Sequence, residues 1–224
     1  MGNNIIKGEA NMKKIVSVLL TLAMMVSIVG SAFATATTTA TSADINPFSD
    51  VADNSWYKPG VLYCNSKGLM SGTSKTIFNP TGYMTRGMMA VVMYRAAGQQ
   101  SMTDKEIKNN GYTDVSSDAY YAAAVTWAKM NGVMSGYSDT KFGPNDNITR
   151  EQIVTILYRY MAPAPVKADN FADEDKISPF AMEAVDWARA NNIVGGKGGN
   201  MFDPQGLATR AEVATILYRF IEGI

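Results

Sequence analysis

The chain has 224 residues, and its 20 lysines and arginines balance 20 aspartates and glutamates, so its formal net charge at pH 7 is zero. This balance argues against a protein that binds nucleic acid or anionic lipid through a large positive charge. The absence of histidine and the presence of one cysteine exclude an intrachain disulfide, a Cys/His zinc site and a histidine general base. The sequence therefore predicts no cofactor and no metal site.

The N-terminal region has the pattern of a secretory signal. A basic Met-Lys-Lys at 12–14 precedes an apolar run at 15–29, and Ala-Phe-Ala at 32–34 has the small residues of a cleavage site. Signals begin at their basic end, so the expected translation start is Met12, not Met1. The apolar run has about 15 residues, whereas a membrane helix needs about 20. We therefore expect residues 1–34 to be removed on export and no membrane span to remain.

Cleavage changes the charge balance only slightly. The removed region carries three lysines and one glutamate, which leaves 17 basic and 19 acidic residues and a net charge of −2. The exported chain then begins with a flexible Thr/Ala-rich lead-in at 35–47.

A Thr-Arg pair followed by apolar residues occurs three times along the rest of the chain. The first and second pairs are 64 residues apart, and the second and third are 60 residues apart. A fixed set of other residue types recurs at the same offsets, which predicts a triple repeat. The equivalent positions are Thr85-Arg86, Thr149-Arg150 and Thr209-Arg210; Gly72, Gly136 and Gly196; Phe78, Phe142 and Phe202; Pro80, Pro144 and Pro204; and the Tyr-Arg pairs Tyr94-Arg95, Tyr158-Arg159 and Tyr218-Arg219.

Each Thr-Arg pair is expected to begin an amphipathic helix with threonine as its N-cap. In the third copy, the apolar residues at helical spacing are Val213, Ile216, Leu217 and Phe220. The residue three positions after the threonine decides whether a capping box forms. Glu212 and Gln152 can complete the box in the third and second copies, whereas Met88 in the first cannot.

The arginine at the first helical position leaves two interpretations open. The helix end is partially positive and disfavours a cation there by about 0.3–1 kcal/mol. In one interpretation the arginine and the free backbone N–H groups of the helix start jointly receive an anion. In the other, its stem packs while its head is solvated or paired with a neighbouring carboxylate. The recurrence of the arginine in all three copies favours anion binding.

Each repeat is predicted to contain a first helix, a glycine turn, a loop with Phe-x-Pro, and the Thr-Arg helix. Gly68, Gly132 and Asn192 are the expected left-handed residues that end the first helices. The first helices are expected at about 55–68, 119–132 and 179–192. The repeats are placed at 48–98, 112–162 and 171–224, with linkers at 99–111 and 163–170 and one possible helical turn at 104–108. No repeat buries enough apolar surface to be stable alone, so the three repeats should pack together.

The repeated features resemble three tandem S-layer homology domains, which hold surface proteins on bacterial cell walls. The resemblance covers residues 48–224 and is carried by an aromatic-x-Asp box, the Gly-x-x-x-Gly turn, Phe-x-Pro and a Thr-Arg-Ala-Glu type of motif. It implies a mostly α fold, with three helix-loop-helix repeats in a pseudo-threefold assembly and ligand grooves between neighbours. It also implies a secreted, non-catalytic anchor attached to the cell wall or S-layer. The implied partner is a secondary cell-wall polysaccharide attached to peptidoglycan, often ending in N-acetylmannosamine with a pyruvate ketal.

The resemblance assigns candidate groove residues by position. The three arginines are expected to bind the ketal carboxylate, the box aspartates to bind hydroxyls or serve as framework, two aromatics to stack on sugar, and two glycines to allow close backbone approach. In that order they are Arg86, Arg150 and Arg210; Asp50, Asp114 and Asp173; Trp56 and Tyr120; Gly72 and Gly136. The sequence departs from the family pattern at Met88, where the glutamate is lost, and at Phe180, which stands at the position of the stacking aromatics.

Two alternative functions remain open from the residues. A wall-glycan hydrolase needs only two carboxylates about 5–10 Å apart and no histidine, but capping and turns already explain the repeated acids. A self-assembling subunit of a surface layer is the other alternative, because the chain has 15 methionines that could form adhesive surfaces. Met89 and Met93 fall on an apolar helical stripe, however, and are expected in the core.

Overall fold

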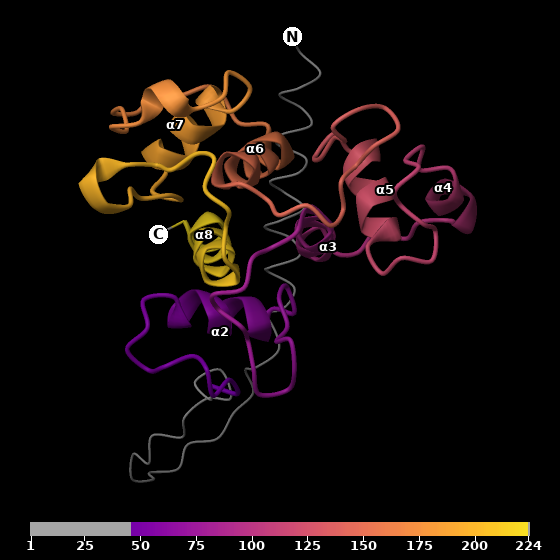
Figure 1. Ribbon diagram of the computed structural model, residues 1–224, viewed down its shortest axis with the longest axis horizontal. Helices are drawn as coiled ribbons and strands as arrows, with labels where there is room; N and C mark the ends of the chain where they lie inside the picture. The colour runs from indigo at the N-terminus through magenta and orange to yellow at the C-terminus, as the bar shows by residue number, and fades with distance from the viewer. Residues whose placement is uncertain (1–45, 224) are drawn as a thin grey trace, which may run out of the picture.

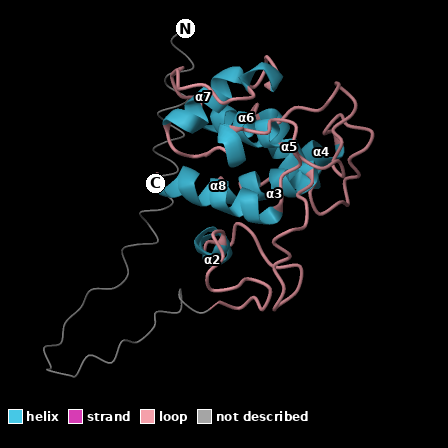
Figure 2. Ribbon diagram, turned by 60° about the vertical axis from the view of Figure 1, so that its left-hand side comes forward, coloured by secondary structure: helices cyan, strands magenta, loops and turns pink. Residues whose placement is uncertain are grey.

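The computed structural model describes residues 46–223, and the predicted signal region and the start at Met12 lie outside this range. The described residues form helices joined by long loops, with isolated β-bridges and no strand (Figure 2). The predicted mostly α fold is therefore confirmed. The α-helices are α2 (Lys58–Ser66), α3 (Arg86–Ala96), α4 (Asp104–Lys108), α5 (Ala122–Met130), α6 (Arg150–Met161), α7 (Met182–Ala190) and α8 (Arg210–Glu222), and the short 3-10 segments are Glu174–Lys176 and Gly198–Asn200. None of the helices within 46–223 has both the length and the apolar character that crossing a membrane requires.

The Thr-Arg helices α3, α6 and α8 begin as the sequence predicts. The side chain of each preceding threonine accepts a hydrogen bond from the backbone N–H three residues on. Gln152 and Glu212 complete capping boxes in α6 and α8. Helix α3 has no capping box, because the Met88 side chain has no oxygen to accept a hydrogen bond from the Thr85 backbone N–H. The helical turn expected at 104–108 is present as α4, with its own capping box from Thr103 and Glu106.

The first helices of the repeats, α2, α5 and α7, are shorter than expected at both ends. Their N-cap residues offer no side-chain hydrogen bond, and the preceding residues form turns instead of a helical turn. At the other end, Gly68 and Gly132 have φ of 67° and Asn192 has φ of 57°. These are the left-handed residues predicted to follow each first helix.

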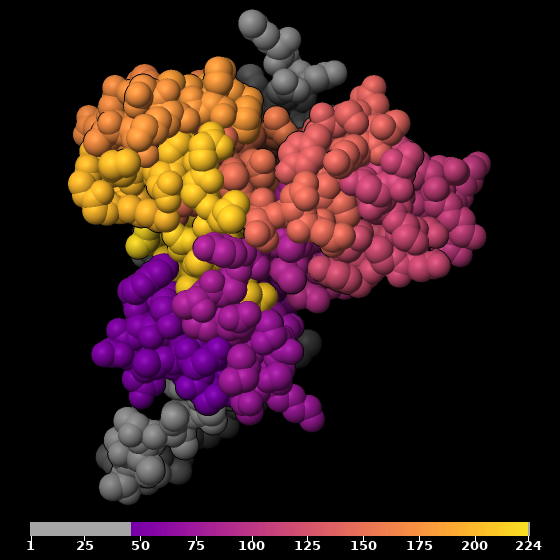
Figure 3. Space-filling model, in the orientation of Figure 1, coloured from indigo at the N-terminus to yellow at the C-terminus, as the bar shows by residue number. Residues whose placement is uncertain are grey.

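Each first helix packs against the Thr-Arg helix of the preceding repeat. The close pairs are α2 with α8, α3 with α5, and α6 with α7. Figure 1 shows α3, α6 and α8 towards the middle of the molecule, with α2, α5 and α7 further out, and Figure 3 shows the three resulting lobes. The pairing of α2 with α8 joins the first repeat to the last.

Three backbone hydrogen bonds connect the repeats where the Thr-Arg helices begin. The Met84 N–H donates to the Ala208 carbonyl at 3.0 Å, the Ala208 N–H donates to Ile148 at 3.0 Å, and the Ile148 N–H donates to Met84 at 2.9 Å. All three residues are buried, so these bonds form in a site shielded from water. The contacts between repeats thus form a closed ring, while exact pseudo-threefold symmetry stays a prediction.

The hydrophobic core is continuous through all three repeats. It includes apolar residues predicted on the Thr-Arg helices and one valine from each first helix. Cys64 is also buried in this core, and burial raises the pKa of its thiol to about 12. The buried residues of the first helices and the Thr-Arg helices are Val61, Val125, Val185, Met89, Met93, Val213, Ile216 and Leu217. Because the helix pairs cross repeat boundaries, neighbouring repeats contribute to this burial.

Candidate functional site

The three candidate arginines are buried at the junctions between repeats, with Arg86 and Arg150 each 5% exposed and Arg210 8% exposed. Each Nε donates to the carbonyl of the Phe-x-Pro phenylalanine of the following repeat, and the third arginine reaches the first repeat. The acceptors are Phe142 for Arg86 at 3.0 Å, Phe202 for Arg150 at 2.8 Å and Phe78 for Arg210 at 2.8 Å. The arginines therefore hold neighbouring repeats together.

Further hydrogen bonds link two of these arginines to the glycine turns. The Nη2 atom of Arg86 donates to the Ser135 carbonyl at 2.7 Å, and the Nη2 atom of Arg210 donates to Ser71 at 2.6 Å. The Arg86 guanidinium also lies over the Tyr137 ring, 4.4 Å from its centroid. Burial lowers the pKa of each arginine, but at neutral pH a guanidinium stays protonated.

The expectation that free backbone N–H groups help to receive an anion is wrong. At the start of α3, the Arg86 N–H donates to the Asp146 carbonyl at 2.9 Å, and the Gly87 N–H donates to Pro144 at 2.8 Å. In α6 and α8, the first two N–H groups likewise donate to the equivalent loop carbonyls of another repeat. The next N–H group in each helix is taken by the capping threonine. An anion at these junctions would thus depend on side chains.

The box aspartates form the framework of the Phe-x-Pro loop. Each carboxylate accepts two backbone N–H groups at 2.7–2.9 Å, one from the phenylalanine and one from the next residue. In chain order the pairs are Asp50 with Phe78 and Asn79, Asp114 with Phe142 and Gly143, and Asp173 with Phe202 and Asp203. The loop is thereby positioned so that its carbonyl can accept from the arginine of the preceding repeat.

Asp114 and Asp173 should make the stability of the fold depend on pH in the acid range. Burial opposes ionisation of Asp114 and Asp173, but the two backbone donors outweigh it and hold the pKa of each below the ordinary value of 3.8. A lowered folded-state pKa stabilises the fold above about pH 4, and this contribution is lost as the pH falls through the folded-state value. We expect the urea midpoint to fall as the pH is lowered below the ordinary aspartate pKa of 3.8. In Asp173→Asn the midpoint should be lower at neutral pH and less dependent on pH, and a pH profile parallel to that of the wild type would contradict this assignment.

The glycines Gly72 and Gly136 have no room for a side chain. A Cβ at Gly72 would lie 2.4 Å from the Ser74 carbonyl oxygen, and one at Gly136 would lie 2.4 Å from the Lys141 oxygen. The predicted close backbone approach is therefore present, but it is made by the chain's own loop.

The candidate stacking aromatics are exposed. Trp56 is 63% exposed, Tyr120 is 68% exposed, and Phe180, at the equivalent position of the third repeat, is 55% exposed. Each stands immediately before a half-buried or buried residue that packs into the fold. Large apolar side chains at one repeated surface position are available to bind a ligand.

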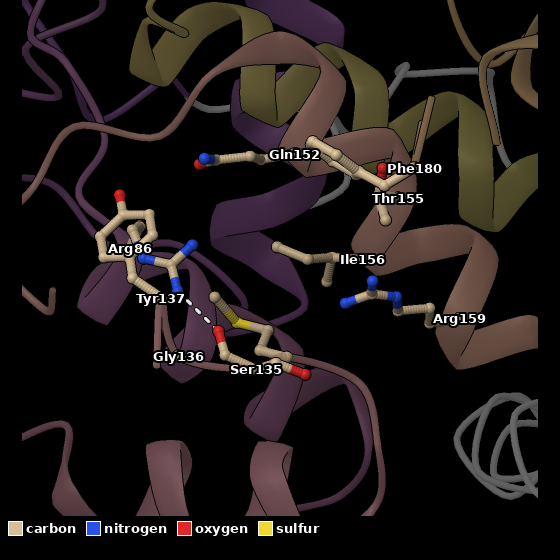
Figure 4. Close-up of a pocket in the computed structure, with 10 residues that line it drawn as sticks. Arg86, Ser135, Gly136, Tyr137, Gln152, Thr155, Ile156, Arg159 and Phe180 are labelled. Carbon is tan, nitrogen blue, oxygen red and sulfur yellow. Dashed lines mark hydrogen bonds between the residues drawn. The ribbon is translucent and has the colours of Figure 1, made fainter. Parts of the chain in front are cut away.

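Two grooves between repeats bring some of these residues together. The Arg86 groove has a volume of about 230 Å³ and is lined by Arg86, by Met134–Tyr137 of the glycine turn, by Gln152, Thr155, Ile156 and Arg159 of α6, and by Phe180 (Figure 4). The Arg150 groove has a volume of about 390 Å³ and is lined by Arg150, by Val194–Lys197, by Glu212, Thr215, Ile216 and Arg219 of α8, and by Trp56. The two grooves are equivalent residue for residue under the repeat offset. Of the other candidates, Gly136 lines the Arg86 groove, whereas Arg210, Tyr120, Gly72 and the three aspartates line neither.

The site prediction omitted the second arginine of each groove. Arg159 and Arg219 each lie two helical turns after the groove's capping residue and line the same space as Arg86 and Arg150. Arg159 is exposed, and no hydrogen bond or ion pair of its guanidinium is found within 46–223. The recurrence of arginine at 95, 159 and 219 was visible in the sequence and could have identified these positions.

Known proteins share the repeat. A family model described as the S-layer homology domain matches residues 47–90, 111–154 and 170–214, beginning within one residue of each predicted repeat. An endoglucanase of Bacillus sp. (strain KSM-635) is 30% identical over 211 residues, which are 88% of this chain and 21% of that protein. The surface-layer 125 kDa protein of Lysinibacillus sphaericus is 27% identical over 83% of this chain and 16% of its own length.

A cellulosome-anchoring protein of Acetivibrio thermocellus is 22% identical over 68% of this chain and 35% of its own length. The chain thus spans about a fifth of the endoglucanase and about a third of the anchoring protein, so the activities in these names belong to much longer chains. What is shared is the repeat, and the family model matches it in all three copies. This chain belongs to the S-layer homology domain family.

Proposed function

We propose that this chain anchors a protein non-covalently to the bacterial cell surface. It binds an anionic secondary cell-wall polysaccharide in the grooves between repeats, without catalysis. The observation that carries the proposal is the equivalence of the Arg86 and Arg150 grooves, each of which combines buried and accessible arginines with an exposed aromatic. Related proteins named as surface-layer and cellulosome-anchoring proteins support the cell-surface location.

The lining of the grooves suits a carboxylated sugar. The exposed rings of Trp56 and Phe180 offer flat apolar faces to a pyranose, and the arginine side chains offer forked donors to a carboxylate. A pyruvate ketal on N-acetylmannosamine carries such a carboxylate and is the ligand we propose. The buried ends of Arg86 and Arg150 keep the grooves in shape through their bonds to the next repeat.

A glycan hydrolase is less well supported by the same grooves. The Arg86 groove has no carboxylate among its lining residues, and the Arg150 groove has only Glu212. A glycosidase mechanism uses two carboxyl groups that flank the scissile bond. Release of new reducing ends from muropeptides would nevertheless favour the hydrolase, and sedimentation of the protein without wall material would favour a self-assembling subunit.

The test is co-sedimentation of residues 35–224 with purified Gram-positive sacculi. We expect binding that is lost after hydrofluoric acid removes the phosphodiester-linked polymer. Binding that survives the acid would point to peptidoglycan as the ligand and contradict the proposal. Failure to bind untreated sacculi would contradict anchoring itself.

Aromatic stacking gives a point-mutation test of the same proposal. The double variant Trp56→Ala/Phe180→Ala removes the exposed ring from both grooves. An aromatic contact contributes about 0.5–1.5 kcal/mol, so we expect the affinity for sacculi to fall roughly tenfold. Met130→Ala is the control, because Met130 is also exposed, at 62%, but lines neither groove. Equal affinities of the double variant and the control would refute the role of the aromatics.

A further inference from the structure

The Arg86 and Arg150 grooves differ at the third helical position of their second helix. This position is Gln152 in α6 and Glu212 in α8, and each residue completes the capping box of its helix. Gln152 also lines the Arg86 groove, and Glu212 lines the Arg150 groove. This substitution changes the charge beside the arginine and leaves the helix start intact. The glycine turns differ as well, because Lys197 in the Arg150 groove stands at the position of Tyr137 in the Arg86 groove.

In the Arg150 groove, the glutamate already pairs with one guanidinium nitrogen of the arginine. The Glu212 Oε1 atom lies 3.2 Å from Arg150 Nη1 and 3.3 Å from Lys197 Nζ. Its Oε2 atom accepts from the Thr209 N–H at 2.8 Å. The side chains of Arg150 and Glu212 are only 6% and 15% exposed, so water screens this ion pair poorly. A ligand carboxylate would have to compete for Arg150 with a carboxylate that the fold already holds in place.

The charge state of Glu212 supports this competition at neutral pH. Burial raises the pKa of its carboxyl group, but the Thr209 backbone donor, Arg150 and Lys197 outweigh that effect and lower it below the ordinary value of 4.5. Glu212 is therefore ionised at neutral pH, as a sugar carboxylate is.

In the Arg86 groove, the corresponding arginine keeps a free donor. Arg86 uses Nε and Nη2 for the carbonyls of Phe142 and Ser135, and within the described residues its Nη1 atom has no partner. Gln152 brings no charge. Figure 4 shows Arg86 and Arg159 on opposite sides of Ile156, both in the groove. Two guanidinium groups thus face a space that has no carboxylate in its lining.

The third junction lacks this combination. Met88 stands at the position of Gln152, and the Arg210 Nη1 atom lies 4.0 Å from the Met84 sulfur. Arg95, the equivalent of Arg159, donates from Nη1 to the Leu69 carbonyl at 3.2 Å. Of the three junctions in the described part of the chain, only the one at Arg86 leaves the Nη1 atom of its buried arginine without a hydrogen-bond partner.

We propose that the residue at the third helical position selects which groove takes the anionic ligand. Gln152 leaves Arg86 and Arg159 open to a carboxylated sugar, whereas Glu212 acts as a built-in competing carboxylate that closes the Arg150 groove at neutral pH. This inference rests on the proposed function, because it concerns which of the proposed grooves is used.

Two reciprocal substitutions test it. Gln152→Glu places a carboxylate beside Arg86, as in the Arg150 groove, and Glu212→Gln removes the one beside Arg150. Glutamine and glutamate each complete a capping box at this helical position in this chain, so both variants should fold. Thermal unfolding followed by circular dichroism checks this. Asp104→Asn is the charge control for Glu212→Gln, because Asp104 is exposed on α4 and lines neither groove.

The measurement is isothermal titration calorimetry of residues 35–224 with the methyl glycoside of N-acetylmannosamine carrying a pyruvate ketal. We expect one site in the wild type and in Asp104→Asn. Gln152→Glu should weaken this site at least tenfold, and Glu212→Gln should add a second site. If the wild type binds the glycoside while Gln152→Glu binds equally well, or Glu212→Gln gains no site, the inference is wrong and the proposed function stands. If the wild type binds neither the glycoside nor sacculi, both are wrong.

Discussion

Replacing Arg210 with alanine is expected to destabilise the fold by about 4 kcal/mol. The substitution leaves the carbonyls of Phe78 and Ser71 without their donor, and each orphaned buried acceptor costs about 1–3 kcal/mol. It also removes the guanidinium that lies 4.6 Å from the centroid of the Phe78 ring. The free energy of unfolding from urea titration of residues 35–224 measures this effect.

The matched control for this substitution is Arg159→Ala. Arg159 is the same residue type but is exposed, and no partner for it is found among residues 46–223. An exposed substitution of this kind changes stability by no more than about 0.5 kcal/mol. If both variants lost equal stability, the arginine that joins the third repeat to the first would not have the structural role assigned to it.

Replacing Gly136 with alanine should cost about 3 kcal/mol, at the upper end of the usual range for overpacking. The added Cβ would lie 2.4 Å from the Lys141 oxygen and 2.6 Å from Cε1 of Tyr112. The first contact is with backbone, so a rotamer change cannot relieve it. The glycine turn also supplies the Ser135 carbonyl that binds Arg86, so binding at the Arg86 groove should weaken together with stability.

Gly195→Ala is the control for the glycine turn. Gly195 lies in the corresponding turn of the third repeat, its φ is not positive, and the nearest atom to an added Cβ is 3.9 Å away. Alanine at such a position reduces the entropy of the unfolded chain and stabilises by about 0.4–1 kcal/mol. Thermal unfolding of the two variants should therefore shift in opposite directions, and a similar loss in both would indicate a general intolerance of the turn.

The local features of this fold could be predicted because their causes lie within a few residues. Thr209 and Glu212 are three positions apart, so their capping box was visible in the sequence, and the structure contains it. The left-handed residue after each first helix could be assigned in the same way at Gly68, Gly132 and Asn192. The ends of the first helices were predicted less well, because turns replaced the expected first helical turn.

The candidate site was predicted in part. The sequence indicated arginines and aromatics at repeated positions, and Trp56 with Arg150 does line one groove. Arg159 and Arg219 were not assigned, although they line the grooves with Arg86 and Arg150. The helix-start N–H groups proposed for an anion are instead bound to loop carbonyls of other repeats, which no pattern within one repeat could reveal.

The sequence by itself determined the number of repeats, their helices and caps, and the apolar stripe that forms the core, because these depend on spacing and local hydrogen bonding. The tertiary structure decided which helices pair and which carbonyls each arginine reaches. It also decided that Glu212 forms an ion pair with Arg150, whereas Arg86 keeps a free donor beside Gln152. Arg210 and the carbonyl of Phe78 are 132 residues apart in the chain. Contacts of that separation form only when the repeats close into a ring, and local periodicity does not encode them.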